Sequence, residues 1–197
     1  SEWAVPIATP VKRDGTVRVC RDFKVTINPH LKIDEYPLTC TDEIYSSLSG
    51  GKEFSLIDLR QAYLQMELDN ESKQYLIINT HRRLYQYQHL PYRVASVLAI
   101  WQRTMDQVLQ GINSVQICYL DDIIITGKTN SDHLSTLEKV LQRLEENGFK
   151  MNKEKCKFLQ DSVEYLGHVI SPSGLHQTPS KVQAIVDMHI PGDVTQL

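Results

Sequence analysis

The chain contains 197 residues, of which 41% are hydrophobic and 23% are charged, and its formal net charge is −3. This length and apolar content suffice for one compact domain, with room for a smaller lobe, and they exclude a disordered chain. The slightly negative charge excludes a protein that coats nucleic acid through bulk positive charge, although it leaves a local basic groove open.

The first part of the chain favours a β-hairpin, a loop and a short helix. Asp14-Gly15 lies between two short β-prone runs within residues 10–20, which is a strong local hairpin signal. Residues 29–37 carry a proline at each end and are typical of a loop. A short helix is then expected to begin at Thr41 and to end at Gly50-Gly51.

Three apolar β runs follow, and two of them meet at a pair of aspartates. Residues 53–59 predict a strand buried on at least one side, near whose end Asp58 is out of character with its apolar neighbours. Residues 115–120 and 123–126 predict two strands joined through Asp121-Asp122. We expect a tight hairpin there with both carboxylates at its tip.

Helices separate and follow these strands. Apolar residues recur at helical spacing within residues 99–112, and a longer helix is expected from Asn130 or Ser131 to Gly148. A strand over residues 162–170 and a helix opened by Thr178-Pro179 complete the order. This order predicts an α+β fold, a sheet with helices packed on one face.

The three aspartates suggest a metal-dependent phosphoryl transfer. Two divalent ions, one activating the attacking hydroxyl and one holding the leaving group, need hard oxygen ligands that converge from separate strands. Asp58, Asp121 and Asp122 fit this need, and the backbone carbonyl of Leu59 is a further candidate ligand. Alternatively, the aspartates are an ordinary polar turn and strand end. Apolar sequence on both sides of Asp121-Asp122 favours the catalytic interpretation.

The sequence resembles the reverse transcriptases of gypsy-type LTR retrotransposons. The resemblance is carried, in chain order, by Ser1-Glu2-Trp3-Ala4, Lys12-Arg13-Asp14-Gly15, Arg18-Val19-Cys20-Arg21-Asp22-Phe23, Asp34-Glu35-Tyr36-Pro37-Leu38, Asp58-Leu59-Arg60-Gln61-Ala62-Tyr63, Trp101-Gln102-Arg103-Thr104-Met105, Tyr119-Leu120-Asp121-Asp122 and Tyr165-Leu166-Gly167-His168. Each motif alone is weak, but together they span essentially the whole chain. The last of them resembles the primer grip, a hairpin that supports the primer end, and a plain edge strand is the alternative.

This resemblance implies the fingers and palm of a right-hand polymerase, with an antiparallel palm sheet and the thumb largely missing. Fingers are expected at residues 1–49 and 76–91, palm at 50–75 and 92–170, and the start of a connection toward a thumb at 171–197. The implied reaction adds dNTPs to a primer on an RNA or DNA template, using two Mg²⁺ ions, with Mn²⁺ as an alternative. The implied partners include the thumb and RNase H domains of a parent Pol polyprotein.

Roles for further residues also follow from the resemblance. Basic residues of the fingers would contact the incoming triphosphate: Lys12, Arg13 and Arg18. Tyr63 would pack beneath the sugar and screen against a ribose hydroxyl, and Tyr92 would lie beside the nucleotide pocket. Lys155 would act as general acid near the leaving pyrophosphate. The alternative interpretations are a solvated charged hairpin, a core tyrosine and a solvated basic turn.

Two departures from the family pattern point to weak activity. Arg93 stands where these enzymes have a glycine that lets the backbone approach the nucleotide and template, and Leu98 replaces a proline that stiffens a turn. A silent remnant or a co-opted nucleic-acid-binding module is therefore the alternative function. A different two-metal enzyme on a palm-like sheet, such as a nuclease or nucleotidyl cyclase, is a third.

Cysteine spacing and hydropathy bear on the compartment. The four cysteines lie far apart without a CxxC pair, so neither a disulfide framework nor a zinc knuckle is indicated. No run reaches transmembrane length, and the first residues lack the features of a secretion signal. The sequence thus predicts an intracellular protein of the cytoplasm or nucleus that is neither secreted nor membrane-bound.

Overall fold

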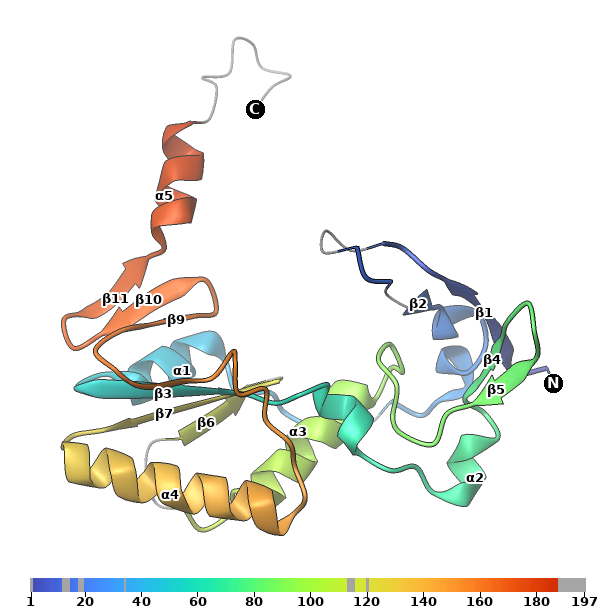
Figure 1. The fold of residues 1–197 in the computed structure, drawn as a ribbon, viewed down its shortest axis with the longest axis horizontal. Coiled ribbons are helices and arrows are strands. Elements are labelled where there is room, and N and C mark those ends of the chain that lie inside the picture. The colour runs from blue at the N-terminus through green and yellow to red at the C-terminus, as the bar shows by residue number, and fades with distance from the viewer. Residues whose placement is uncertain are drawn as a thin grey trace.

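The computed structural model describes residues 2–11, 15–17, 20–33, 35–112, 116–119 and 121–187. Figure 1 shows a central sheet layered between helices, with a smaller lobe that holds the N-terminus beside it. The helices are α1 (Thr41–Leu48), α2 (Asn70–Lys73), α3 (Val97–Val108), α4 (Asn130–Glu146) and α5 (Pro179–Val186), with 3-10 turns η1 (Phe23–Val25), η2 (Asn28–His30) and η3 (Ala62–Gln65).

The strands form three sheets. In chain order they are β1 (Ala4–Ala8), β2 (Cys20–Arg21), β3 (Glu53–Asp58), β4 (Ile77–Asn79), β5 (Leu84–Gln86), β6 (Gln116–Tyr119), β7 (Asp122–Gly127), β8 (Lys157–Gln160), β9 (Val163–Tyr165), β10 (His168–Ser171) and β11 (Gly174–Gln177). The central sheet has the order β6-β7-β3-β8 and is antiparallel throughout. The smaller lobe holds β2-β1-β4-β5, and β11-β10-β9 form a third sheet.

The central sheet is buried on both faces, which explains the unbroken apolar run of β7. Ile123 and Ile125 pack with α3 and α4, whereas Ile124 between them packs with α1 and the β9–β10 sheet. All three are fully buried, as the alternation of side chains along a strand requires. The expected α+β class with an antiparallel sheet is confirmed. Two helices cover one face as expected, while α1 lies on the opposite face (Figure 1).

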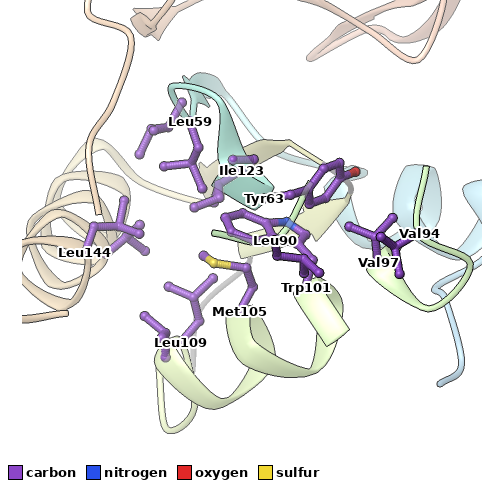
Figure 2. Close-up of a cluster of buried hydrophobic side chains, with 14 of the residues drawn as sticks. Leu59, Tyr63, Leu90, Val94, Val97, Trp101, Met105, Leu109, Ile123 and Leu144 are labelled. Atoms are coloured by element: carbon purple, nitrogen blue, oxygen red, sulfur yellow. The ribbon is translucent and has the colours of Figure 1, made fainter. Parts of the chain in front are cut away.

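The larger core cluster lies directly beneath the end of β3. Figure 2 shows Leu59 and Tyr63 from the segment after β3 facing Trp101 and Met105 of α3. The Trp101 ring meets Tyr63 edge to face at 5.5 Å and Phe149 at 5.7 Å between ring centroids. Such edge-to-face contacts give the aromatic rings a defined orientation. The segment that follows Asp58 therefore packs on well-ordered aromatic side chains.

A buried histidine fixes α4 against the sheet. Nε2 of His133 lies 2.8 Å from the Ser55 hydroxyl, and its Nδ1 lies 3.0 Å from the Glu53 carbonyl oxygen. The Ser55 hydroxyl also accepts the Leu159 N–H at 3.1 Å, so α4, β3 and β8 are linked. A Cβ on Gly127 would lie 2.6 Å from the backbone nitrogen of His133, which shows how closely the start of α4 approaches β7.

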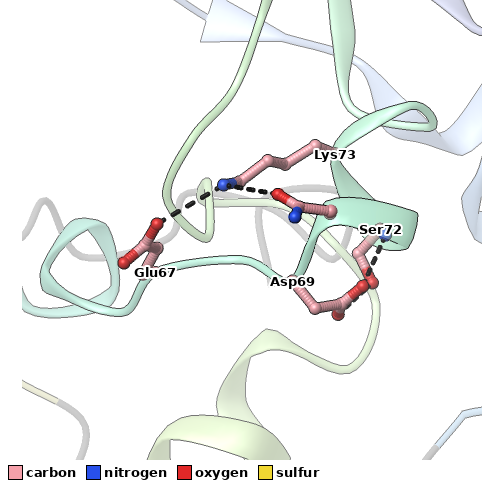
Figure 3. Close-up of polar contacts among 5 residues, drawn as sticks. Glu67, Asp69, Ser72 and Lys73 are labelled. Carbon is pink, nitrogen blue, oxygen red and sulfur yellow. Dashed lines mark hydrogen bonds and ion pairs between the residues drawn. The ribbon is translucent and has the colours of Figure 1, made fainter.

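The short helix α2 connects the segment after β3 to β4 of the smaller lobe. Asp69 caps it by accepting the Ser72 N–H at 2.8 Å and the Ser72 hydroxyl at 2.6 Å (Figure 3). Lys73 lies 3.4 Å from Glu67 and 3.3 Å from the Asn70 side chain. These are surface contacts, so α2 is held by its cap rather than by burial.

Some expected elements differ in detail. The single strand that the apolar pattern predicts over residues 162–170 is wrong, whereas the hairpin that the resemblance implies at residues 165–168 is confirmed. Leu166 and Gly167 both adopt positive φ, 49° and 76°, as a two-residue primed turn requires. The expected helix over residues 99–112 is instead α3, which begins and ends earlier. Strand β8 was not expected, because its lysine-containing edge sequence has no clear apolar alternation.

The N-terminal hairpin is described only in part. Val11 and Val17 form an antiparallel bridge, as the hairpin prediction requires, while residues 12–14 lie outside the described residues. Across the part of the chain that the structure describes, no helix is both long enough and apolar enough to cross a membrane.

Candidate active site

The register of the central sheet brings the three aspartates together. Asp58, the last residue of β3, pairs directly with Asp122, the first residue of β7. The Leu59 N–H then donates to the Asp121 carbonyl at 3.1 Å. Tyr119 pairs with Asp122, so Asp121 lies in the turn and Asp122 in the strand, rather than both at the hairpin tip as expected. The three carboxylates therefore share one end of the sheet.

Burial and mutual repulsion make this site unfavourable for negative charge. Burial, followed by the charges of Asp58 and Asp121, raises the pKa of Asp122 to about 6. Burial also raises the pKa of Asp121, against a hydrogen bond from Tyr63 that lowers it. The Oδ1 atom of Asp121 is buried without a hydrogen-bond partner in the described structure. An orphaned carboxylate oxygen among like charges is suited to a divalent cation.

The aspartates are neighbours but do not form a complete metal cage. Among the described residues, no three His, Cys, Asp or Glu side chains surround a common metal position. Leu59, the expected carbonyl ligand, has a side chain that is only 2% exposed. The donor set thus fits hard divalent ions such as Mg²⁺, with the remaining ligands to come from water and substrate.

Lys155 brings the one opposite charge that the described structure places within salt-bridge distance of Asp58. Its Nζ lies 3.4 Å from Oδ2 of Asp58, and the lysine side chain is 66% exposed against 21% for the aspartate. The backbone of the preceding turn is fixed, because the Asn152 N–H donates to the Asp58 carbonyl at 2.8 Å. The exposure of Lys155 agrees with a solvated basic turn, and its contact with Asp58 is a feature that this interpretation does not include.

Tyr63 and Tyr92 lie together beside Asp121. Their rings meet at 4.9 Å between centroids, and Tyr63 hydrogen-bonds the Asp121 carboxylate. Burial, then the charge of Asp121, raises the pKa of Tyr92. Tyr63 is only 5% exposed, so it packs in the core and faces the aspartates at once. Tyr63 is thus a core tyrosine that also contacts Asp121.

Arg93, where the resemblance leads us to expect glycine, adopts a left-handed backbone. Its φ is +74°, in the left-handed region that favours glycine. Asn28 holds this turn, because its Nδ2 donates to the Arg93 carbonyl at 2.9 Å and its Oδ1 accepts the Ala95 N–H at 3.0 Å. Leu98 is 38% exposed in the first turn of α3, where proline is tolerated.

Other site residues are either undescribed or were not expected. Lys12, Arg13 and Arg18 lie outside the described residues. Sequence reasoning missed Cys156, whose Sγ lies 3.8 Å from the Asp58 carbonyl and whose pKa is raised by burial. It also missed Gln65, whose amide contacts Lys150. No local pattern signals these contacts, because the partners are 85 to 98 residues apart.

Neutralising Asp122 should stabilise the fold at neutral pH. Its pKa is higher in the folded than in the unfolded chain, so the folded state loses stability as pH rises from about 4 through about 6. Asp122→Asn removes this loss. After allowance for solvent screening, we expect a gain of about 1 kcal/mol at pH 7.5 and little gain at pH 4. Urea unfolding of the variant, with Asp161→Asn as an exposed control, measures this; a gain independent of pH would contradict it.

Comparison with known proteins places these features in a family. The family model described as "Reverse transcriptase (RNA-dependent DNA polymerase)" matches residues 12–170. An uncharacterised protein of Caenorhabditis elegans is 38% identical over 200 residues, covering 100% of this chain and 16% of that protein. The retrovirus-related Pol polyprotein from transposon 297 of Drosophila melanogaster is 33% identical, covering 96% of this chain and 18% of the polyprotein. The chain thus spans less than a fifth of the length of these relatives.

Solved structures show the same fold. The foamy viral protease-reverse transcriptase in complex with double-stranded DNA matches with a TM-score of 0.88 and 24% identity, over 98% of this chain and 34% of that one. The same viral enzyme in complex with an RNA/DNA hybrid matches with a TM-score of 0.86 and 23% identity, over 98% and 26%. At this level of identity the match establishes the fold alone.

Proposed function

Since this chain belongs to the reverse transcriptase (RNA-dependent DNA polymerase) family, we propose that it is the fingers-and-palm part of a retrotransposon polymerase of the gypsy type. Asp58, Asp121 and Asp122 are its proposed catalytic carboxylates. The observation that carries the proposal is the direct register between Asp58 and Asp122 at one end of the sheet, with Asp121 adjacent. The family membership also removes the nuclease and cyclase alternatives.

The three carboxylates and the Leu59 carbonyl would hold two Mg²⁺ ions, with Mn²⁺ as an alternative. These ions activate the primer hydroxyl and neutralise charge on the triphosphate when bound. The buried, unpartnered oxygen of Asp121 supports this assignment, because a cation would supply its missing interaction. Tyr63 hydrogen-bonds Asp121, and it is proposed to pack beneath the sugar of an incoming nucleotide and to screen against a ribose hydroxyl.

Charged residues around the aspartates would handle the phosphates. Lys155 is proposed to donate a proton to the leaving pyrophosphate, and its position beside Asp58 supports this role. Lys12, Arg13 and Arg18 of the fingers are proposed to neutralise the triphosphate oxygens. Tyr92, in contact with Tyr63, is proposed to line the nucleotide pocket.

The proposed division into subdomains follows the sheets of the fold, except that α1, which lies within residues 1–49, packs on the central sheet. Fingers would comprise residues 1–49 and 76–91, and palm residues 50–75 and 92–170, with 171–197 leading toward a thumb. The sheet order supports this division, since β1, β2, β4 and β5 form one sheet and β3, β6, β7 and β8 another. A thumb and an RNase H domain are proposed partners in a longer Pol polyprotein that acts in the cytoplasm or nucleus. The template and primer would be RNA or DNA.

Primer extension tests the proposed function. The chain, fused after residue 197 to a thumb from a family member, should add dNTPs to a DNA primer on an RNA template only when Mg²⁺ or Mn²⁺ is present. Mg²⁺ should also raise the melting temperature of the chain itself, because a bound ion offsets the repulsion among the aspartates. Absence of both effects in folded protein would contradict the proposal, whereas binding of primer-template without extension would favour a silent nucleic-acid-binding remnant.

A further inference from the structure

Gln65, the last residue of η3, connects the chain segments that carry Asp58 and Lys155. Its Nε2 donates to the carbonyl oxygens of Arg60 at 2.8 Å and Lys150 at 3.0 Å. Its Oε1 accepts the Lys150 N–H at 2.6 Å. A single side-chain amide thus pairs with both backbone groups of Lys150 and with the carbonyl of Arg60, two residues after Asp58.

The contacts of Gln65 belong to a short ladder between residues 58–60 and 150–152. The Arg60 N–H donates to the Lys150 carbonyl at 2.9 Å, and the Asn152 N–H donates to the Asp58 carbonyl at 2.8 Å. Leu59 and Met151 form a β-bridge between them. Gln65 therefore closes the open end of this ladder, next to the pair formed by Arg60 and Lys150.

The position of Lys155 depends on this ladder. The N–H groups of Lys155 and Cys156 donate to the Asn152 carbonyl at 3.0 and 3.1 Å, so the turn is built on Asn152. The ion pair between Lys155 and Asp58 cannot fix the turn by itself, because the lysine side chain is largely exposed and flexible. Its placement must come from the backbone of residues 150–156.

We propose that Gln65 is a positioning residue, whose amide holds residues 150–156 against the end of β3 and so keeps Lys155 beside Asp58 during nucleotide addition. It acts through these residues and contacts neither metal nor substrate. The inference rests on the proposed roles of Asp58 and Lys155. The chemistry requires an amide, since only that group offers two donors and an acceptor at one point.

Gln65→Glu is the sharpest variant. It preserves the shape of the side chain but sets a carboxylate against the carbonyl oxygens of Arg60 and Lys150, which accept hydrogen bonds and cannot donate them. Gln65→Ala removes the amide without this repulsion, and it is the second test variant if Gln65→Glu folds poorly. Gln110→Glu, at an exposed position just after α3, is the matched control.

The structural test needs no polymerase activity. Hydrogen exchange of the amides in residues 150–156 should be about tenfold faster in both Gln65 variants, as expected for the loss of one or two hydrogen bonds, and unchanged in the control. Alkylation of Cys156, read by mass spectrometry, should accelerate to a similar degree, with the exposed Cys40 as internal reference. Unchanged exchange and alkylation in a folded variant would overturn the proposal.

The kinetic test separates positioning from stability, in the thumb fusion. Gln65→Glu should lower kcat about tenfold with KM for dNTP nearly unchanged, and adding it to Lys155→Ala should cause no further loss. Losses that multiply in the double variant, or normal kcat despite faster exchange, would overturn the positioning role. If the parent fusion fails to extend a primer under any condition, the proposed function fails, while exchange and alkylation still report whether Gln65 holds the segment.

Discussion

Restoring glycine at position 93 and proline at position 98 should raise primer extension by the thumb fusion about tenfold or more. Arg93 has a left-handed backbone, and it carries a long cation where the resemblance leads us to expect glycine. Without this side chain the backbone can approach the nucleotide more closely. Proline in the first turn of α3 makes the adjoining turn rigid. The rate of single-nucleotide addition by Arg93→Gly, Leu98→Pro and the double variant measures the effect.

The stability of Arg93→Gly distinguishes a local effect from a general one. Relief of the left-handed backbone should stabilise the fold by about 1 kcal/mol, while the greater freedom of glycine in the unfolded chain costs nearly as much. The free energy of unfolding should therefore change little. Arg82→Gly, at an exposed arginine in the turn before β5, is the control. Efficient extension by the original chain, unchanged by the reversions, would show that Arg93 is tolerated.

The proximity of the three aspartates could be predicted from the sequence because two unrelated signals agreed. Aspartates at the ends of apolar strands are locally out of place, and the resemblance assigned them a shared role. The structure adds the register, in which Asp58 faces Asp122 and the apolar residues of both strands divide between two cores. A shift of one residue would send Asp58 to the other face, so the buried pattern itself fixes the site.

Other features had no sequence signal strong enough to predict them. The apolar run of β7 suits burial on both faces, so it could not show that α1 would pack opposite α3 and α4. Leucine rarely adopts positive φ, and for this reason the turn at Leu166 did not interrupt the expected strand. The contacts of Gln65 join residues 85 apart, and only the folded backbone brings them together.

The charges at the candidate site lower the stability of the chain, as is common for catalytic centres. Three carboxylates, the buried Tyr63 and the half-buried Tyr92 share a region where charge is unfavourable, and Lys155 offsets it only from the surface. The carboxylate charges that destabilise the metal-free chain are the same charges that would attract divalent ions. Variants that neutralise an aspartate should therefore raise the stability of the fold and lower its activity.

Asp121→Asn should abolish nucleotide addition while leaving the fold intact. The loss should reach about a thousandfold, because a metal ligand contributes several kcal/mol to stabilising the charged transition state. Asparagine has nearly the same shape and its carbonyl can still accept the hydrogen bond of Tyr63, so packing against Trp101 should persist. The measurement is single-nucleotide addition in the background of Arg93→Gly and Leu98→Pro, where the parent rate is highest.

Two comparisons make this result specific to the metal site. Asp161→Asn neutralises an exposed carboxylate in the turn before β9 and should leave the rate unchanged. Since burial already opposes the charge of Asp121, the inactive variant should unfold at the same or a higher urea concentration than the parent, and Mg²⁺ should stabilise it less. A variant that loses activity and stability together would indicate disrupted packing, and one that retains activity would remove Asp121 from the catalytic set. Loss of rate with retained stability is the combination that requires the carboxylate charge itself.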